Sequence, residues 1–238
     1  MPLLLTRPKA QGTDFAHHLQ ARFGSQLNVI STPLLVPEIF DPVLPSGPFS
    51  ALILTSQTGV ASYVRLCAKH DLPKDVFCVG ERTAHAAVQA GLTCLSHAQD
   101  AASLILQIRS LRPKGRLLHL RGRETRGNIN ALLDLGGIDT VDAIVYAQNS
   151  RQLTPHAIAT LRGGLPVLAP LFSPRTAALF NLELARIHAV SPLFVAAMSS
   201  EVALELRATN AQIKVSDRPD ACAMADTIAL LLQDLQRA

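Results

Sequence analysis

The stretch LILTSQTGVASYV, Leu52 to Val64, contains the pattern that predicts the fold. An apolar run gives way at Thr55–Gly59 to hydroxyl, amide and glycine residues, and a helical spacing of apolar residues then begins. This order is typical of a buried parallel strand that leads into a helix. Ligands of parallel sheets bind beyond the carboxyl ends of the strands, so the hydroxyl groups here are candidates for a binding site.

The chain repeats this pattern in its second half. Leu52–Val64 resembles LAPLFSPRTAALF, with Ser56 on Ser173, at an offset of about 117 residues. LLLTRP resembles LLHLRG, with Arg7 on Arg121, at an offset of about 114 residues. CVGERTA resembles AMSSEVA, with Gly80 on Ser199, at an offset of about 119 residues. Three matches in one order predict two similar α/β domains, although chance similarity between amphipathic βα units is the alternative.

Strand-like and helix-like segments alternate along the whole chain. The predicted strands are Leu3–Thr6, Val29–Thr32, Ala51–Thr55, Val76–Val79, Arg116–Leu120, Thr140–Tyr146, Pro166–Leu171, Leu193–Ala197 and Gln212–Val215. The predicted helices are Lys9–Phe23, Thr58–Lys69, Arg82–Ala90, Ala101–Leu111, Arg123–Leu135, Pro155–Leu161, Pro174–Arg186, Glu201–Thr209 and Ala221–Gln236.

Two extended segments, Pro33–Pro42 and Val141–Arg151, are the predicted crossings between the domains. If both cross, the first βα unit belongs with the C-terminal half. We therefore expect one discontinuous domain, residues 1–36 and 150–238, and a second domain, residues 37–149, joined by a two-stranded linker.

Composition narrows the function without identifying it. The 238 residues are 48% hydrophobic, enough to bury one large or two small cores. A net charge of +4 favours an anionic partner. The basic residues are scattered, and the aromatic residues are eight Phe and two Tyr with no Trp, so we expect no nucleic-acid binding.

The cysteines and the chain start give further expectations. Cys67, Cys78, Cys94 and Cys222 form no CxxC motif and are expected to be reduced core residues. The apolar run at the start is short for a signal peptide, and no stretch is long enough to span a bilayer. We expect a cytoplasmic protein without membrane contact.

Four loops that open helices are the candidate binding elements: TSQTGV, VGERTA, FSPRT and AMSSEVA. Helix N-termini offer free N–H groups to an anion, but the same hydroxyl groups are also common helix N-caps. Arg7, Arg121, Arg123 and Arg126 sit at or after strand ends and are suited to carboxylates, although surface ion pairs would also explain them. Tyr146 ends a strand at a predicted crossing, where its phenol could donate a proton or simply be packed.

Several kinds of site are not indicated. No GxSxG, HExxH, P-loop or GxGxxG motif occurs, and cysteine and histidine residues are not clustered. We therefore expect no metal, no nucleotide and no hydrolase triad.

The order of these motifs resembles the uroporphyrinogen-III synthase family. The matching stretches are LLLTRP, ALILTSQTGV, VGERTA, LLHLRG with Arg126, VDAIVYA, VLAPLFSPRTAALF and Pro219–Met224. The resemblance implies two α/β domains around a cleft and a monomeric, cofactor-free lyase of tetrapyrrole (heme) biosynthesis. Its substrate would be hydroxymethylbilane, an open-chain tetrapyrrole with many carboxylates, which is closed with inversion of ring D and loss of water.

The resemblance also implies roles for particular residues. Tyr146 would be catalytic, and the substrate would be bound by Thr6, Arg7, Thr55, Ser56, Thr83, Arg121, Gly122, Ser173 and Ser199. The chain has Val202 in the last loop, where the family often has Thr, which puts the role of Ser199 in doubt.

Two other functions fit the same pattern less well. A two-lobed cytoplasmic protein that binds or senses a small anion would also hinge between lobes, but no DNA-reading helix is evident. A flavodoxin-like FMN protein would need a phosphate-binding fingerprint, which is missing. The isomer formed from hydroxymethylbilane would separate these alternatives from a synthase.

Overall fold

A computed structural model of the chain describes residues 1–124, 127–206 and 211–237. The chain divides into two compact units, Met1–Val36 with Asn149–Ala238, and Pro37–Gln148. We refer to them as unit 1 and unit 2 and describe each by itself. Arg126 and the end of the predicted helix Glu201–Thr209 lie outside the described residues.

Unit 1 is built on a five-stranded sheet of order β11-β10-β9-β1-β2, in which the recorded strand pairs are parallel. Its strands are β1 (Pro2–Leu5), β2 (Asn28–Ser31), β9 (Val167–Leu171), β10 (Leu193–Ala197) and β11 (Ala211–Val215). Its helices are α1 (Lys9–Phe23), η1 (Gly24–Gln26), α6 (Pro155–Arg162), α7 (Pro174–Arg186), α8 (Ser200–Leu204) and α9 (Ala221–Arg237).

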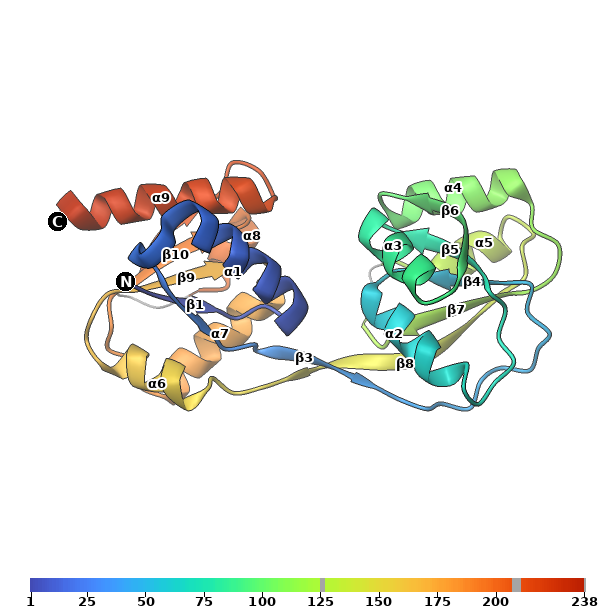
Figure 1. Cartoon of the computed structure of the whole chain (residues 1–238), viewed down its shortest axis with the longest axis horizontal. Coiled ribbons are helices and arrows are strands. Elements are labelled where there is room, and N and C mark those ends of the chain that lie inside the picture. Colours follow the sequence, from blue (N-terminus) through green and yellow to red (C-terminus); the bar gives the residue numbers. More distant parts are fainter. Residues whose placement is uncertain (125–126, 207–210, 238) are drawn as a thin grey trace. The chain divides into compact units, whose positions relative to one another are not determined.

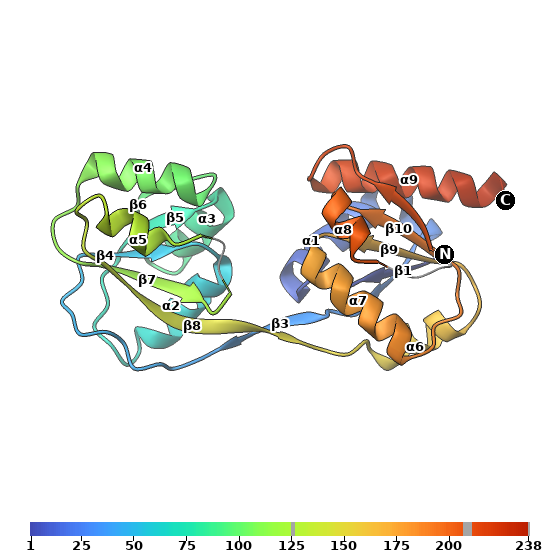
Figure 2. The same cartoon turned by 180° about the vertical axis from the view of Figure 1, so that it is seen from behind.

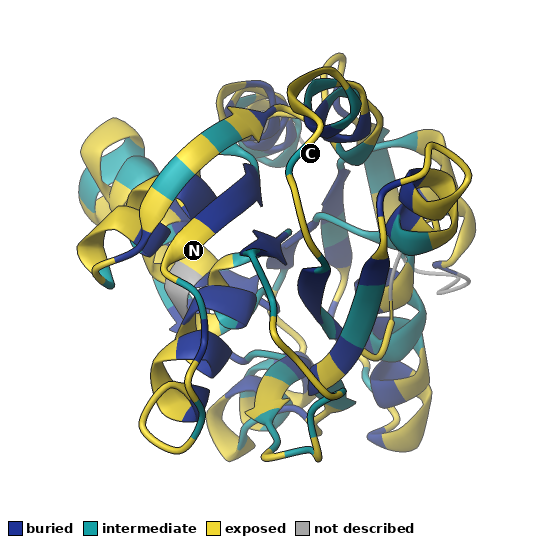
Figure 3. Cartoon of the chain, turned by 90° about the vertical axis from the view of Figure 1, so that its right-hand side faces the viewer, coloured by how far each residue is buried: buried dark blue, intermediate teal, exposed yellow. Residues whose placement is uncertain are grey.

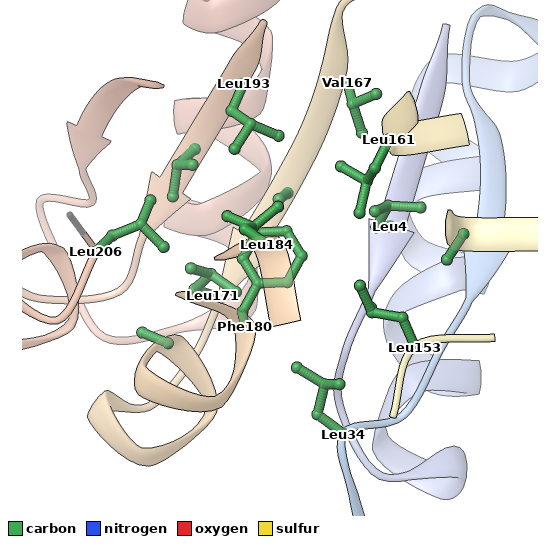
Figure 4. Close-up of a cluster of buried hydrophobic side chains, with 14 of the residues drawn as sticks. Leu4, Leu34, Leu153, Leu161, Val167, Leu171, Phe180, Leu184, Leu193 and Leu206 are labelled. Carbon is green, nitrogen blue, oxygen red and sulfur yellow. The ribbon is translucent and has the colours of Figure 1, made fainter. Parts of the chain in front are cut away.

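Helices cover both faces of this sheet (Figure 1). Leu3 and Leu5 pack with α1 and α9, whereas Leu4 packs on the opposite face with α6, α7 and α8. Figure 4 shows the second of these clusters, with Phe180 of α7 against Leu171 and Leu184. Burial on both faces explains why these strands read as continuous apolar runs.

Unit 2 contains a six-stranded sheet of order β3-β8-β7-β4-β5-β6. Its strands are β3 (Leu35–Ile39), β4 (Ala51–Leu54), β5 (Asp75–Val79), β6 (Thr93–Ala98), β7 (Leu117–Gly122) and β8 (Thr140–Ser150). The first two residues of β3 and the last two of β8 belong to unit 1. Its helices are α2 (Gln57–Leu66), α3 (Glu81–Gln89), α4 (Ala101–Leu111) and α5 (Ile129–Asp134). From β8 to β6 the neighbouring strands pair in parallel.

The two faces of this second sheet are also covered. Leu52 and Leu54 of β4 pack with α2 and α3, while Ala51 and Ile53 pack with α4 and α5. Figure 2 shows these four helices around the sheet from behind. In Figure 3 most strands are dark blue and therefore buried, a strand at the rim is mainly yellow and teal, and the outer sides of the helices are largely yellow.

The repeat predicted from the sequence has a counterpart in strand order. Read from β8, the sheet of unit 2 runs β8-β7-β4-β5-β6, and read from β2, the sheet of unit 1 runs β2-β1-β9-β10-β11. The three matched stretches therefore fall on equivalent strands: β1 with β7, β9 with β4, and β10 with β5. The predicted α/β class with two parallel sheets is confirmed.

Some predicted elements are wrong in extent or missing. The helix predicted at Arg123–Leu135 begins only at Ile129, because Gly127 has a φ of 77° and Asn128 caps the helix through the N–H of Ala131. The strand β6 was not predicted, since its residues alternate in exposure and form no apolar run. The strand β3 was predicted only as an extended crossing; it is the edge strand beside β8.

The cysteine prediction is partly wrong. All four cysteines are free, and Cys78 is buried as expected. Cys94 is half-buried, whereas Cys67 at the end of α2 and Cys222 in the first turn of α9 are exposed. Burial raises the pKa of the Cys78 thiol to about 12, so this side chain stays a protonated thiol in the core of unit 2.

Candidate functional site

Ser56 occupies the turn between β4 and α2, at the carboxyl edge of the sheet of unit 2. Its backbone is extended, and its Oγ accepts a hydrogen bond from the N–H of Gly59 at 3.1 Å. This is the N-cap geometry that the TSQT sequence favours, because the first N–H groups of a helix have no partner within the helix. Ser56 is therefore fixed at the start of α2.

Tyr146 meets Ser56 from another strand. It lies on β8, only 9% exposed, and its hydroxyl is 2.8 Å from the Oγ of Ser56. The two residues are 90 positions apart in the chain. They come within reach of each other because only one strand, β7, separates β4 from β8 in the sheet. The structure thus joins two of the predicted site residues by a hydrogen bond.

Gly122 lies beneath the ring of Tyr146. The pairing of β7 with β8 shifts register between Arg121 and Gly122, which places Gly122 opposite Tyr146. A Cβ atom on Gly122 would lie 2.7 Å from Cε2 and 2.8 Å from Cζ of the tyrosine ring, closer than carbon atoms pack. The ring occupies this place only because residue 122 has no side chain.

A cavity of about 1060 Å³ opens beside this pair, within unit 2. Thr55, Arg121 and Tyr146 are among its lining residues, together with His119, Asn130 and Asp142. Its other charged lining residues are Asp100, Glu124 and Asp134. Among the described lining residues, four carboxylates accompany one guanidinium. The basic anion cradle expected at this strand end stays a prediction, since Arg126 lies outside the described residues.

Arg121 is already paired. Its Nε donates to Oδ2 of Asp142, on the neighbouring strand β8, and its Nη1 donates to the carbonyl oxygen of Gly122 at 3.0 Å. The alternative considered from the sequence, an ion pair, therefore describes Arg121 in this state. A substrate carboxylate would have to compete with Asp142 for the guanidinium.

His119 is a lining residue that the sequence did not single out. It is 3% exposed, and its Nδ1 is 3.1 Å from Oδ1 of Asn130. Burial lowers the pKa of this imidazole to about 4, so the ring is neutral near neutral pH. With Asn130 as acceptor, Nδ1 carries the hydrogen and Nε2 is a lone pair, which has no partner among the described residues.

Thr83 lies apart from this cavity, in the first turn of α3. It is buried, and its N–H donates to the carbonyl oxygen of Gly80 at 3.1 Å. Gly80 caps the helix with a φ of 83°, a left-handed conformation that glycine adopts without strain. Thr83 is not among the described residues that line the cavity.

The remaining predicted residues lie at the carboxyl edge of the sheet of unit 1. The Oγ of Ser173 accepts from the N–H of Thr176 at 3.2 Å and caps α7, whereas Ser199 donates to the carboxylate of Glu201 at 2.6 Å. The guanidinium of Arg7 lies 3.9 Å above the ring centre of Phe172. Thr6 is fully buried, and its Oγ1 has no hydrogen-bond partner in the described part of the chain.

Apart from Thr83, the predicted residues fall into two groups. Unit 2 brings Thr55, Ser56, Arg121, Gly122 and Tyr146 together. Unit 1 holds the second group, whose members are Thr6, Arg7, Ser173 and Ser199. The substrate-binding roles of both groups stay predictions.

Over residues 1–124, 127–206 and 211–237, no three or more His, Cys, Asp or Glu side chains gather as a possible metal site. None of the helices in these ranges is both long and apolar enough to cross a membrane.

Comparison with known proteins identifies the relatives of the chain. The family model described as uroporphyrinogen-III synthase HemD matches residues 26–226. No curated protein shows significant sequence similarity to the chain.

Solved structures with this fold include two bacterial ones. Uroporphyrinogen-III synthetase from Helicobacter pylori 26695 is 18% identical, with a TM-score of 0.62 over 97% of this chain and 98% of that one. A mutant uroporphyrinogen III synthase from the extremely thermophilic bacterium Thermus thermophilus is 14% identical, with a TM-score of 0.50 over 100% of both chains. At such identities the likeness establishes the fold.

Proposed function

Because the chain belongs to the uroporphyrinogen-III synthase family, we propose that it catalyses the ring closure after which this family is named. The substrate would be hydroxymethylbilane, and the products uroporphyrinogen III and water, with ring D inverted. The enzyme is a cyclising lyase of tetrapyrrole biosynthesis. The family match over residues 26–226 is the observation that carries this assignment.

The proposed chemistry begins with loss of the terminal hydroxyl. A proton donor protonates that oxygen, the C–O bond breaks with its electron pair on oxygen, and water leaves. The methylene carbon of ring A, from which the hydroxyl left, then bonds to the substituted carbon of ring D and gives a spiro intermediate. The bond from that ring D carbon to the methylene carbon of ring C breaks, and the freed methylene bonds to the unsubstituted α-carbon of ring D, so that ring D is inverted. A proton lost when the last pyrrole regains its aromaticity returns to the donor, so the sum is the loss of one water.

Tyr146 is the residue we propose as that donor. Its hydroxyl can donate a proton and lies beside the cavity of unit 2, held by a 2.8 Å hydrogen bond to Ser56. His119 lines the same cavity but is neutral near neutral pH, because its burial lowers its pKa to about 4. This leaves the phenol as the better candidate for a positioned general acid.

We propose Thr6, Arg7, Thr55, Thr83, Arg121, Ser173 and Ser199 as substrate contacts. The N-termini of α2, α3 and α7 support this role, since helix N-termini attract carboxylates. The carboxylates that line the cavity of unit 2 disfavour a substrate carboxylate there. We therefore place most acidic side chains of the substrate at the helix starts and one at Arg121, with the pyrrole rings along the rest of the cavity.

The finer properties of the protein belong to the same proposal. We propose a cytoplasmic monomer that acts on hydroxymethylbilane without nucleic acid or a membrane as partner, and without a metal or an organic cofactor. The family resemblance supports these points.

Product analysis tests the function. Purified protein is mixed with freshly generated hydroxymethylbilane, the products are oxidised to porphyrins, and the isomers are separated. We expect the III isomer to form faster than spontaneous closure, which gives the uninverted I isomer. Formation of the I isomer alone, at the rate seen without protein, would contradict the proposal, whether or not the protein binds the substrate.

A further inference from the structure

The hydrogen bonds around Ser56 fix the direction in which Tyr146 can donate. Resting on the proposed function, we infer that Ser56 and Gly122 are positioning residues that hold the Tyr146 hydroxyl and turn its hydrogen toward the substrate. On this view neither of them binds substrate itself. The inference assigns the Ser56 hydroxyl as donor and the Tyr146 oxygen as acceptor in their 2.8 Å contact.

The assignment follows from the hydrogen-bonding capacity of a serine hydroxyl, which has one hydrogen and two lone pairs. One lone pair of the Ser56 Oγ accepts from the N–H of Gly59 at 3.1 Å. If Tyr146 also donated to it, the hydrogen of Ser56 would need a further acceptor, and its contacts among the described residues are with Gly59 and Tyr146. Either direction leaves one hydroxyl hydrogen without a partner among the described residues. Donation from Ser56 leaves that hydrogen on Tyr146, which lines the cavity and can meet water or substrate there, whereas Ser56 is not among the described lining residues.

The direction of this bond has a chemical consequence. When Tyr146 accepts from Ser56, its own hydrogen is free for the departing hydroxyl. As that proton moves and the C–O bond breaks, negative charge develops on the phenol oxygen. The bond from Ser56 then becomes a bond to a charged acceptor, which is stronger than a neutral one. Ser56 thus stabilises the transition state without touching the substrate.

Gly122 determines how closely the ring of Tyr146 lies above β7. A Cβ atom there would lie 2.7 Å from Cε2 and 3.1 Å from the hydroxyl oxygen of Tyr146. Residue 122 is buried in the sheet, so the ring would have to move instead of the new methyl group. Movement of the ring would lengthen the bond to Ser56.

A double-mutant cycle tests the role of Ser56. Single-turnover rates, kcat and KM are measured for Ser56→Ala, Tyr146→Phe and the double variant. We expect Ser56→Ala to lower kcat roughly three- to tenfold, the loss of about one hydrogen bond, with KM changed less than about twofold. On the Tyr146→Phe background the same substitution should cost almost nothing, since Ser56 acts through the phenol oxygen.

A conservative variant separates positioning from general structural damage. Ser56→Thr keeps the hydroxyl and the helix cap, and we expect it to recover most of the rate lost in Ser56→Ala. Two outcomes would show that Ser56 binds substrate directly and would overturn the inference. One is a rate loss in the double variant that equals the product of the losses of Ser56→Ala and Tyr146→Phe. The other is a rise in KM for Ser56→Ala at unchanged kcat.

The role of Gly122 is tested in the same way. Gly122→Ala should slow turnover about tenfold or more in the wild-type background, because the methyl group displaces the ring. Combined with Tyr146→Ala, which removes the ring, it should cause no additional loss. Equal losses in both backgrounds would overturn the role assigned to Gly122.

Gly163→Ala is the matched control for Gly122→Ala. A Cβ at Gly163 would be no closer than 3.4 Å to its neighbours, an ordinary contact, and the residue ends α6 in unit 1. It should leave turnover unchanged. Thermal melts of all variants identify any that fail to fold, and the Ser56 cycle decides the inference if Gly122→Ala is among them.

Failure of the inference and failure of the proposed function look different. If the wild-type protein makes no III isomer, the proposed function is wrong. If it makes the III isomer and the losses of the Ser56 and Tyr146 variants multiply, the function stands and the inference is wrong.

Discussion

At the scale of the residue, His119 links the cavity of unit 2 to the stability of the fold. Its burial lowers the pKa of the imidazole from 6.5 to about 4 in the folded chain. Between these two pH values the unfolded chain binds a proton that the folded chain does not. The free energy of unfolding therefore falls as the pH is lowered from about 6.5 to about 4, by up to about 3 kcal/mol, and levels off below.

Urea unfolding at about pH 7.5 and about pH 4.5 measures this contribution. We expect His119→Gln to lose less stability between the two pH values than wild type does. His85→Gln, which changes an exposed histidine of α3, is the control and should behave as wild type. A His119→Gln curve that falls in parallel with wild type would contradict the assignment.

Arg121 and Asp142 give the second prediction at this scale. If Arg121 binds a substrate carboxylate, Arg121→Gln should raise KM more than it lowers kcat, because the contact is made equally in the ground and transition states. The difference in KM between wild type and Arg121→Gln should shrink as salt is added to both assays. Salt screens the attraction between Arg121 and the substrate, which only the wild type has.

Asp142→Asn separates binding from structure in this test. It frees the guanidinium of Arg121 and should lower KM or leave it unchanged. If instead Arg121 serves only to pair with Asp142, the double variant Arg121→Gln/Asp142→Asn should recover wild-type KM, and Arg121 would leave the list of proposed contacts.

At the scale of the element, helix starts divide into those capped by a side chain and those that are not. The Oγ of Ser173 accepts from the N–H of Thr176, whereas Ser199 makes no cap to the backbone and instead contacts Glu201. Ser173→Ala should therefore lower the free energy of unfolding by about 1 kcal/mol. Ser199→Ala is the matched control and should cost less.

Denaturant midpoints of the two variants decide this comparison. Equal midpoints for Ser173→Ala and Ser199→Ala would contradict the cap assignment. Substrate binding is measured in parallel, because both serines are also proposed contacts. A rise in KM for Ser199→Ala without loss of stability would support its binding role.

Sequence patterns predicted the elements best where a single stretch of the chain carries a clear apolar pattern. The strands buried on both faces, such as Ala51–Leu54, are continuous apolar runs and were predicted almost to the residue. The edge strand Thr93–Ala98 was missed, because one of its faces is exposed and its sequence is mixed. The start of α5 was misplaced, since Gly127 and Asn128 interrupt a sequence with helical spacing.

The sequence named three residues that the structure brings together in unit 2, but it could not show their contacts. Ser56 and Tyr146 were named from their places at strand ends and Gly122 from the family resemblance, yet their mutual contact depends on the order β8-β7-β4 and on a register shift at Gly122. No pattern in the sequence showed that the guanidinium of Arg121 is paired. Its partner Asp142 is 21 residues away in the chain and meets it only because β7 and β8 are neighbouring strands. The contact of His119 with Asn130 arises in the same way, between β7 and the short helix α5.

At the scale of the whole molecule, we propose that the two units are domains, bounded at residues 1–36 with 150–238 and at residues 37–149. Limited digestion with a protease of broad specificity should cut first at Asp41–Pro48 or at Asn149–Leu153. Residues 40–49 form no regular secondary structure, and Val43 is 97% exposed. Cuts at both places would release a fragment close to unit 2.

The masses of the fragments locate the first cuts. Early cuts within α4 or α7 would contradict these boundaries. A variant in which Val43 is replaced by Asp should be cut as fast as wild type, because the exposure of the segment, and not one side chain, sets the rate.

The central claim is that ring closure with inversion depends on Tyr146, and single-turnover kinetics of Tyr146→Phe test it most directly. A general acid contributes roughly 10²–10⁴ in rate, and a single neutral hydrogen bond roughly three- to tenfold. We expect a loss of about 10–100-fold, since water or a substrate carboxylate can relay part of the proton transfer. A wild-type rate together with wild-type isomer purity, in a variant shown to be folded, would contradict the claim.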